Sequence, residues 1–202
     1  PPRATLVLVH GFGEHCSRYL HVCRAFAAHG IEVLTYDQRG FGRTGRKTGP
    51  LGHTYGIKEL HRDVAHFSRQ VYQPGVPHFL FGHSMGGLVV LSYLVQYYPK
   101  HLPVASTNTT DPSTPAPKAQ PAEEPSVPLA GVIGSGPCLQ LAPESRQNFL
   151  MENLAIMLGK VFKSVAIKTA LSLDDLCRDK SVIDAIHDDY YYFGIGSMQC
   201  SK

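Results

Sequence analysis

A serine flanked by glycines has the surroundings best suited to covalent chemistry in this sequence. The stretch Gly82-His83-Ser84-Met85-Gly86 fits the pattern G-x-S-x-G. It follows an apolar run and precedes a helical pattern, so it predicts a sharp turn from a strand into a helix. At such a turn the hydroxyl would stand above the sheet at a helix N-terminus, where partial positive charge favours a developing anion. We therefore predict that Ser84 is a nucleophile; the alternative is a glycine-rich turn with an incidental serine.

A second glycine-rich stretch, His10-Gly11-Phe12-Gly13, follows another short apolar run. Transfer of an acyl group requires two backbone N–H donors that stabilise the oxyanion of the tetrahedral intermediate. Next to a strand-to-helix nucleophile turn, one donor is the residue after the nucleophile and the other lies in such a loop. We predict the amides of Phe12 and Met85 as these donors, with the glycines beside Phe12 leaving room. The alternative is a glycine-rich loop without a chemical role.

Between and around these motifs, strand patterns alternate with helix patterns. Four short apolar runs predict buried strands, and three stretches with apolar residues at helical spacing predict helices. The predicted strands are 6–9, 31–36, 79–81 and 130–133, and the predicted helices are 18–29, 57–72 and 85–98. Residues 40–56 are rich in glycine and basic residues and predict a long surface loop. Such alternation is typical of the α/β class with a parallel, doubly wound sheet.

Two segments depart from this alternation. Residues 106–128 are dense in Pro, Thr, Ala and Ser and contain almost no large apolar residues, which predicts a disordered insertion. From 144 to 168 the chain is apolar at helical spacing, and shorter helical stretches are predicted at 173–177 and 180–186.

The bulk composition narrows the classes of function. The formal net charge is +3 and no basic run with interleaved aromatic residues is present, so no nucleic-acid partner is expected. No cluster has the spacing of metal ligands, so no metal is expected. The five cysteines are an odd number without a C-x-x-C pair, and we find neither a signal peptide nor an apolar run long enough to span a membrane. These features predict reduced thiols and a cytoplasmic protein.

Three blocks of sequence resemble monoacylglycerol lipases. Residues 10–15 (HGFGEH) followed by Arg18-Tyr19 are similar to the HGxGEHxxRY stretch of that family. Residues 37–42 (DQRGFG) resemble its D-x-R-G-x-G turn, and residues 82–88 (GHSMGGL) resemble its nucleophile motif. The blocks occur in the family's order and at about its spacing. They also resemble serine aminopeptidases of the S33 type and lysophospholipase-like hydrolases, so the substrate is specified less well than the fold.

The resemblance implies an α/β-hydrolase fold with a helical cap. We expect the hydrolase core at 1–143, including the insertion at 106–128, the cap or lid at 144–193, and a tail of unclear origin at 194–202. The resemblance also implies Ser84 as the nucleophile and the amides of Phe12 and Met85 as the oxyanion hole. The residues that support these motifs are His10, Gly11, Gly13, Gly82, His83 and Gly86.

The implied reaction is hydrolysis of a monoacylglycerol, or a similar lipid ester, to a fatty acid and glycerol through an acyl-enzyme on Ser84. No cofactor is implied. The cap of such lipases is apolar and touches the membrane, so peripheral contact with a membrane or lipid droplet through the apolar residues between 149 and 165 is expected. The alternative is that these side chains pack onto the core. The sequence leaves the oligomeric state open.

The base that a serine nucleophile requires is not assigned to any histidine. In this fold the acid and then the histidine follow the cap, whereas the last histidine here, His187, lies within the predicted cap. His83 is expected to point away from Ser84, because alternate residues of a strand face opposite sides. His10 is expected to hold the loop after its strand. His53 lies on a predicted loop and is considered as a base but not assigned.

The acid is not assigned either. Asp37 is expected to pin the Arg39-Gly40 turn. The aspartates of the predicted cap are expected to be solvated or to cap helices; they are Asp174, Asp175, Asp184, Asp188 and Asp189. The first residue is Pro1 rather than Met, and no strand pattern follows residue 193. We therefore expect a piece of a longer protein whose C-terminal strands are missing.

Three alternatives to this function remain open. The chain could be a catalytically inactive fragment or pseudoenzyme that acts through binding, which the missing acid and base favour. It could be a peptidase of related fold, which would cleave an aminoacyl amide in preference to a monoglyceride. It could also be an acyltransferase, which would pass the acyl group to an alcohol in preference to water.

Overall fold

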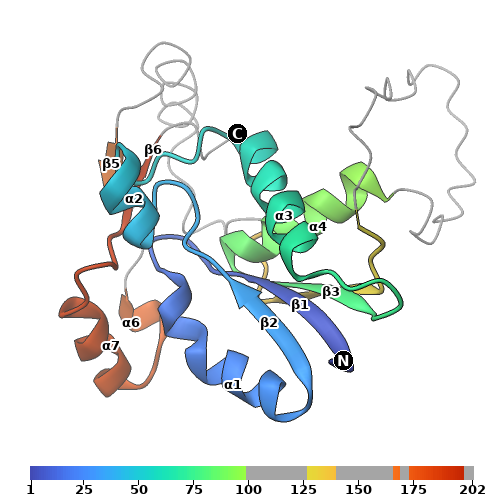
Figure 1. Ribbon diagram of the computed structural model, residues 1–202. Coiled ribbons are helices and arrows are strands. Elements are labelled where there is room, and N and C mark those ends of the chain that lie inside the picture. Colours follow the sequence, from blue (N-terminus) through green and yellow to red (C-terminus); the bar gives the residue numbers. More distant parts are fainter. Residues whose placement is uncertain (99–126, 140–165, 169–172, 198–202) are drawn as a thin grey trace, which may run out of the picture.

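The computed structural model describes residues 1–98, 127–139, 166–168 and 173–197. Within these ranges four parallel strands form one sheet in the order β2-β1-β3-β4 (Figure 1). The strands are β1 (Ala4–Val9), β2 (Ile31–Thr35), β3 (His78–His83) and β4 (Gly131–Ser135). The register places Val9 beside Gly82 and Gly82 beside Gly134, so the carboxyl ends of three strands meet at one edge. The predicted parallel α/β sheet is confirmed.

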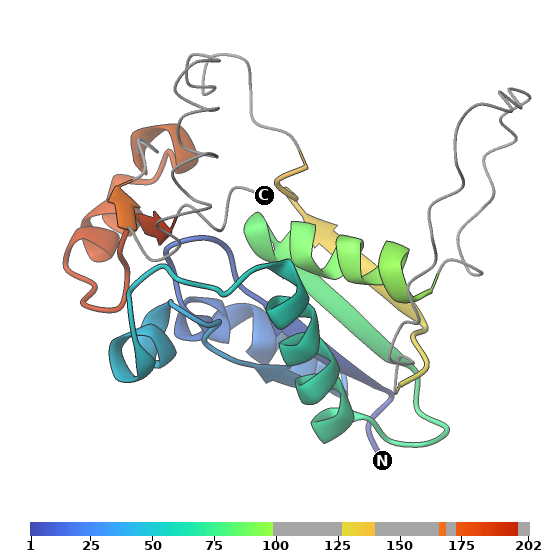
Figure 2. The ribbon, with the colours of Figure 1, turned by 90° about the horizontal axis from the view of Figure 1, so that it is seen from above.

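Helices cover both faces of this sheet. On one face lies α1 (Leu20–Ala28), which follows a short 3-10 helix, η1 (Cys16–Tyr19). On the other face lie α3 (Ile57–Val71) and α4 (Met85–Tyr97), as two perpendicular views show (Figures 1 and 2). The three helices coincide closely with those predicted from apolar spacing, and the doubly wound arrangement follows from them.

The alternation of side chains along β1 divides the core into two layers. Val7 and Val9 point toward α3 and α4, so Leu6 and Leu8 point toward the opposite face. All four side chains are at most 2% exposed. The buried cluster on the α3 and α4 side consists of Val7, Val9, Tyr36, Leu60, Val64, Val71, Leu80, Val89, Val90, Tyr93 and Tyr98.

The glycine-rich stretch after β2 contains a helix where the sequence predicts a surface loop. At the start of this helix, α2 (Gly42–Thr48), the amide of Arg43 donates to the Asp37 carboxylate at 2.7 Å. Gly45 packs against Gly40, since a Cβ at position 45 would lie 2.4 Å from the Gly40 carbonyl oxygen. The prediction is therefore wrong here: the glycines permit close backbone packing, and Asp37 satisfies an amide that a helix N-terminus leaves unpaired.

Four short elements lie beyond the carboxyl ends of the sheet strands (Figures 1 and 2). The helices α6 (Leu173–Leu176) and α7 (Lys180–His187) correspond to the helical stretches predicted there. The strands β5 (Ala166–Lys168) and β6 (Ile195–Ser197) pair in antiparallel fashion. The sequence predicts the end of a helical stretch at 166–168 and no element at 195–197, and both predictions are wrong, because local periodicity does not report pairing between distant segments.

Part of the predicted organisation falls outside the described residues. This applies to the proline-rich insertion up to residue 126 and to the apolar cap residues between 149 and 165. The division into core, cap and tail therefore stays a prediction. Within the described ranges, no helix combines the length and the apolar character needed to cross a bilayer.

Two histidines are buried among the core residues. His78 is 1% exposed and bonds through Nδ1 to the Thr5 hydroxyl at 2.8 Å. His61 is 5% exposed and bonds through Nε2 to the Ser92 hydroxyl at 2.9 Å. Burial removes the water that would stabilise a charged ring and lowers the pKa of each histidine to about 4. Both rings are therefore neutral in the folded protein near neutral pH.

We predict that the folded protein loses stability as the pH falls from about 6.5 toward 4. The unfolded chain binds a proton on each histidine near the ordinary pKa of 6.5, whereas the folded protein resists protonation until about pH 4. The free energy of unfolding then falls by up to about 1.4 kcal/mol per pH unit for each residue. Urea unfolding at a series of pH values measures this slope.

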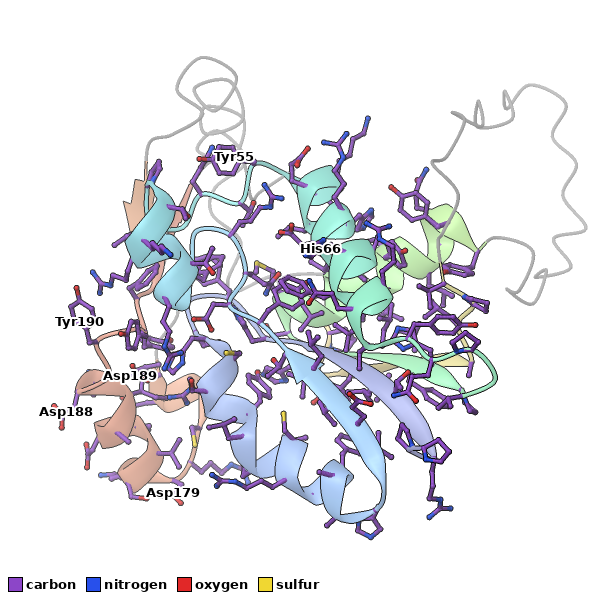
Figure 3. All side chains as sticks on the ribbon, viewed as in Figure 1. Tyr55, His66, Asp179, Asp188, Asp189 and Tyr190 are labelled. Atoms are coloured by element: carbon purple, nitrogen blue, oxygen red, sulfur yellow. The ribbon has the colours of Figure 1, made fainter. Side chains whose placement is uncertain are left out.

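Two variants separate the contribution of the buried histidines to the pH dependence of stability from that of the other titratable groups. One variant changes a buried histidine and the other an exposed histidine. His78→Gln is expected to give a shallower pH dependence than the wild type, because its side chain does not titrate. His66→Gln, at an exposed position of α3 (Figure 3), is the control and is expected to keep the full dependence. Equal slopes in His78→Gln and the wild type would contradict the prediction.

Candidate active site

Ser84 occupies a strained turn between β3 and α4. Its backbone angles are φ 50° and ψ −116°, and a positive φ at a residue with a side chain costs about 1–3 kcal/mol. The Ser84 amide donates to the Ser135 carbonyl at 3.1 Å, and the Ser84 carbonyl accepts from the amides of Leu88 at 3.1 Å and Cys138 at 3.0 Å. The end of β4 and the first turn of α4 therefore hold the strained conformation. A strand-to-helix turn is present where the G-x-S-x-G motif predicts one.

The glycines of the motif allow three backbone segments to meet at this turn. A Cβ at Gly86 would lie 2.2 Å from the Val9 carbonyl oxygen and 2.5 Å from that of His10. A Cβ at Gly82 would lie 2.2 Å from the Gly86 carbonyl oxygen. Real side chains do not fit at such distances. Gly86 therefore lets the start of α4 contact the end of β1, and Gly82 lets β3 approach the same turn of α4.

Residues 10–15, the HGFGEH loop, lie against Ser84. A Cβ at Gly11 would be 3.2 Å from the Ser84 Cβ. Within the described residues, neither the Phe12 amide nor the Met85 amide donates a hydrogen bond. The structure thus brings the two predicted oxyanion segments to the same turn, while the binding of an oxyanion by Phe12 and Met85 stays a prediction.

His10 orients the peptide group that carries the Phe12 amide. Its ring is 0% exposed, and Nε2 accepts a hydrogen bond from the Gln38 amide at 2.9 Å. The ring proton is therefore on Nδ1, which donates to the Gly11 carbonyl at 2.8 Å. Burial lowers the pKa of His10, which keeps the ring neutral. Because a trans peptide is planar, the Phe12 N–H points opposite to the Gly11 carbonyl that His10 holds.

Glu14 folds the HGFGEH loop back on itself, a role that sequence reasoning missed. Its Oε1 accepts from the Gly11 amide at 2.7 Å and from the Tyr19 hydroxyl at 2.6 Å. The guanidinium Nε of Arg18 lies 3.4 Å from Oε2. The signal was present in the sequence, because Glu14, Arg18 and Tyr19 all belong to the same HGxGEHxxRY block.

No base or acid reaches Ser84 within the described part of the chain, where its hydroxyl forms no hydrogen bond. His83 bonds through Nδ1 to the Ser135 hydroxyl at 3.3 Å, and its ring lies 6.0 Å from that of Tyr19. The ring of His53 is buried and lies 4.2 Å from that of Tyr55. Among the described side chains, no three His, Cys, Asp or Glu residues are placed to hold a metal ion.

Asp37 does not pin the Arg39-Gly40 turn as expected. Its carboxylate accepts from the amides of Cys16, at 2.8 Å, and Arg43, at 2.7 Å. Burial opposes ionisation of Asp37, but these hydrogen bonds outweigh it and lower its pKa. Arg39 instead forms a two-pronged ion pair with Asp63, with distances of 2.6 and 2.7 Å.

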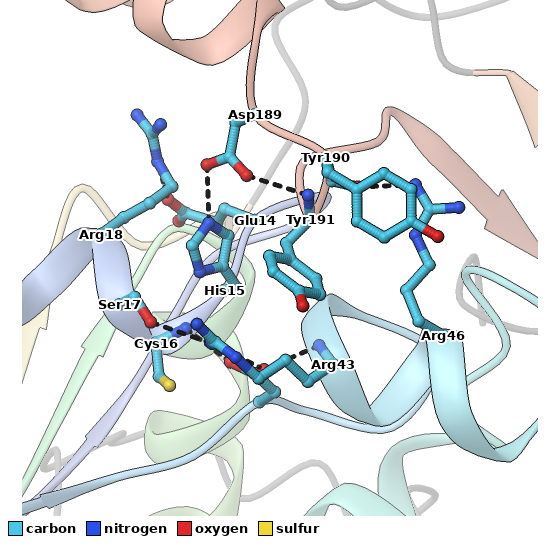
Figure 4. A network of polar contacts seen from close by, with 11 residues as sticks. Glu14, His15, Cys16, Ser17, Arg18, Arg43, Arg46, Asp189, Tyr190 and Tyr191 are labelled. Carbon is cyan, nitrogen blue, oxygen red and sulfur yellow. Dashed lines mark hydrogen bonds and ion pairs between the residues drawn. The ribbon is translucent and has the colours of Figure 1, made fainter.

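Asp189 is neither solvated nor a helix cap, contrary to expectation. Its Oδ2 lies 2.7 Å from Nε2 of His15, and its Oδ1 accepts from the Tyr191 amide at 2.9 Å (Figure 4). Burial opposes ionisation of this carboxyl, but the bonds from His15 and Tyr191 lower its pKa. His15 is only 5% exposed. His15 and Asp189 are far apart in the sequence, so no local sequence pattern predicts the bond between them.

We predict that Gly86→Ala destabilises the protein by about 1–3 kcal/mol, because the added Cβ overlaps the Val9 carbonyl and forces α4 away from β1. Gly134→Ala is the matched control, since a Cβ there would meet its nearest side chains at 3.4 Å, an ordinary contact. Thermal unfolding of both variants measures the difference. Equal unfolding midpoints for Gly86→Ala and Gly134→Ala would contradict the prediction, because they would show that the contact of Gly86 with the Val9 carbonyl does not restrict the side chain at position 86.

Solved structures of lipases resemble this chain along its whole length. The crystal structure of Paleococcus ferrophilus monoacylglycerol lipase matches with a TM-score of 0.74 and 26% identity, covering 100% of this chain and 64% of that chain. A soluble variant of monoglyceride lipase from Saccharomyces cerevisiae, in complex with a substrate analogue, matches with a TM-score of 0.72 and 26% identity, covering 99% and 57%.

Sequence comparison leads to the same group of proteins. Monoglyceride lipase of Saccharomyces cerevisiae is 29% identical over 181 residues, which cover 89% of this chain and 50% of that protein. The chain spans about half the length of the curated relatives it matches. The family described as serine aminopeptidase, S33, matches residues 1–109. The chain therefore belongs to the serine aminopeptidase S33 family and is a monoacylglycerol lipase-like α/β-hydrolase.

Proposed function

We propose that the protein hydrolyses a carboxylic ester of a lipid, most specifically a monoacylglycerol, through an acyl-enzyme on Ser84. The observation that carries the proposal is the strained backbone of Ser84 at the strand-to-helix turn, with the HGFGEH loop in contact. A residue is held at such an unfavourable φ only when surrounding contacts require it, and such strain is concentrated at functional sites. The similarity to monoglyceride lipases supports a lipid ester as the substrate.

In the proposed reaction the Ser84 Oγ attacks the ester carbonyl carbon and the carbonyl oxygen becomes an oxyanion. The amides of Phe12 and Met85 donate to this oxyanion. The carbon–oxygen bond to glycerol breaks, glycerol leaves with a proton, and the acyl group stays on Ser84. Water then attacks the acyl-enzyme and releases the fatty acid, which restores the serine hydroxyl.

The reaction also needs a base for the Ser84 proton, which the described residues do not supply at that hydroxyl. This observation favours a second candidate, a catalytically inactive protein that binds lipid esters without cleaving them. Peripheral contact of the predicted cap with a membrane or lipid droplet is part of the proposed lipid-ester function. The apolar residues expected to make that contact, between 149 and 165, lie outside the described ranges.

A fluorophosphonate probe is expected to label the wild-type chain at Ser84 and to leave Ser84→Ala unlabelled. The matched control is Ser181→Ala, which removes an exposed serine hydroxyl that bonds to Asp179; its labelling should equal that of the wild type. Peptide mass spectrometry locates the adduct. Hydrolysis of a monoacylglycerol should fall by about 10⁴-fold or more in Ser84→Ala. A folded wild-type chain that takes up no label would contradict an active Ser84 nucleophile and would favour the catalytically inactive alternative.

A further inference from the structure

We propose that residues 189–193 (Asp-Tyr-Tyr-Tyr-Phe, the DYYYF segment) bind the HGFGEH loop and hold it in the conformation that directs the Phe12 amide to the oxyanion. We call this contact between the two segments the clasp, and Asp189 and His15 are its positioning residues. The inference rests on the proposed function, because it gives the clasp a role in oxyanion binding. The segment joins α7 to β6, yet it lies beside the loop that follows β1 (Figure 4).

The segment contacts the HGFGEH loop on both sides of Glu14. Asp189 bonds to His15 at 2.7 Å, and the Phe193 amide donates to the Gly13 carbonyl at 2.8 Å. Gly13 has a φ of 76°, and a Cβ there would lie 3.0 Å from the Phe193 carbonyl oxygen. Both neighbours of Glu14 are therefore held by one segment. The Glu14 carboxylate holds the other end of the same loop, which includes the peptide group of the Phe12 amide.

A row of aromatic rings forms a second connection between the segment and Phe12. The Phe193 ring stacks on the Phe41 ring with centroids 6.0 Å apart. The Phe41 ring in turn meets the Phe12 ring edge-on with centroids 5.3 Å apart. Phe41 is 0% exposed, so the row is anchored in the core. Displacement of Phe193 would remove the support on one side of the ring that touches Phe12.

Two arginines of α2 hold the DYYYF segment in place. The Arg46 guanidinium lies 4.1 Å from the Tyr190 ring centroid, and its Nη2 donates to the Tyr190 carbonyl at 2.6 Å. The Arg43 guanidinium lies 4.6 Å from the Tyr191 ring centroid. A guanidinium cation is attracted to the face of an aromatic ring, and two such cation–π pairs join the DYYYF segment to α2. Because the segment rests on α2, it can act as a fixed support for the loop.

Hydrogen exchange tests the clasp without reference to activity. Asp189→Ala is expected to speed the exchange of backbone amides in residues 11–16, because the loop loses its bond at His15. The control is Asp188→Ala, which changes the exposed neighbouring carboxylate (Figure 3) and should leave this exchange unchanged. Unchanged exchange in Asp189→Ala would overturn the proposal.

The kinetics of Ser84 labelling test the positioning role. With a fluorophosphonate, the maximal labelling rate should fall by about tenfold in Asp189→Ala while the probe's apparent binding constant stays the same, since complete loss of one oxyanion donor costs about 10²–10³-fold. Asp189→Asn keeps an oxygen acceptor for His15 and should recover most of the rate. The double variant with His15→Ala should be no slower than either single variant, because both remove one interaction.

The outcomes separate this inference from the proposed function. A wild-type chain without label would refute the function alone, and hydrogen exchange would then decide the clasp. A labelled wild type with an equal maximal rate in Asp189→Ala would refute the positioning role alone. Should Asp189→Ala fail to fold, His15→Ala and His15→Gln supply the same comparison, since a glutamine amide N–H can stand in for the Nε2 donor of His15.

Discussion

The contact between Gly86 and the end of β1 is the constraint on which the arrangement of the site depends. With no side chain at position 86, the first turn of α4 lies against the carbonyls of Val9 and His10. The contact is possible because β1 and β3 are neighbours in the sheet with Val9 beside Gly82. It places the turn at Ser84 beside the loop that follows β1, so the two segments that carry the predicted oxyanion donors meet at the serine.

Buried polar groups hold the loops around this contact. His10 and Gln38 join the loops after β1 and β2, and the Gln38 side-chain amide donates to the His10 carbonyl at 2.6 Å. Both are neutral, which avoids the cost of a charge in the core. Asp37 is a charged group nearby, and its bonds to two backbone amides offset its burial. The backbone beside Ser84 is therefore supported by buried side chains that form hydrogen bonds to backbone groups of the neighbouring loops.

Proposed catalysis and the proposed clasp involve different parts of the chain. The nucleophile turn and the HGFGEH loop directly follow strands of the sheet, whereas the DYYYF segment lies within the range predicted as the cap. Because this segment bonds to His15 and Gly13, a change in the cap region would reach the oxyanion loop through two direct contacts. The chain spans about half the length of its curated relatives, so the activity and substrate of the whole protein remain proposals.

Local sequence patterns determined the strands, the three large helices and the turn at Ser84. Each of these depends on side chains a few residues apart, such as the apolar spacing of α3 or the glycines around the serine. The pattern HGxGEHxxRY likewise contained Glu14, although its hydrogen bonds to Gly11 and Tyr19 became apparent only in the structure. Tertiary structure alone decided the helix at Gly42–Thr48, the pairing of β5 with β6 and the bond between His15 and Asp189. These features arise from contacts between segments that the fold brings together, and sequence periodicity carries no information about such contacts.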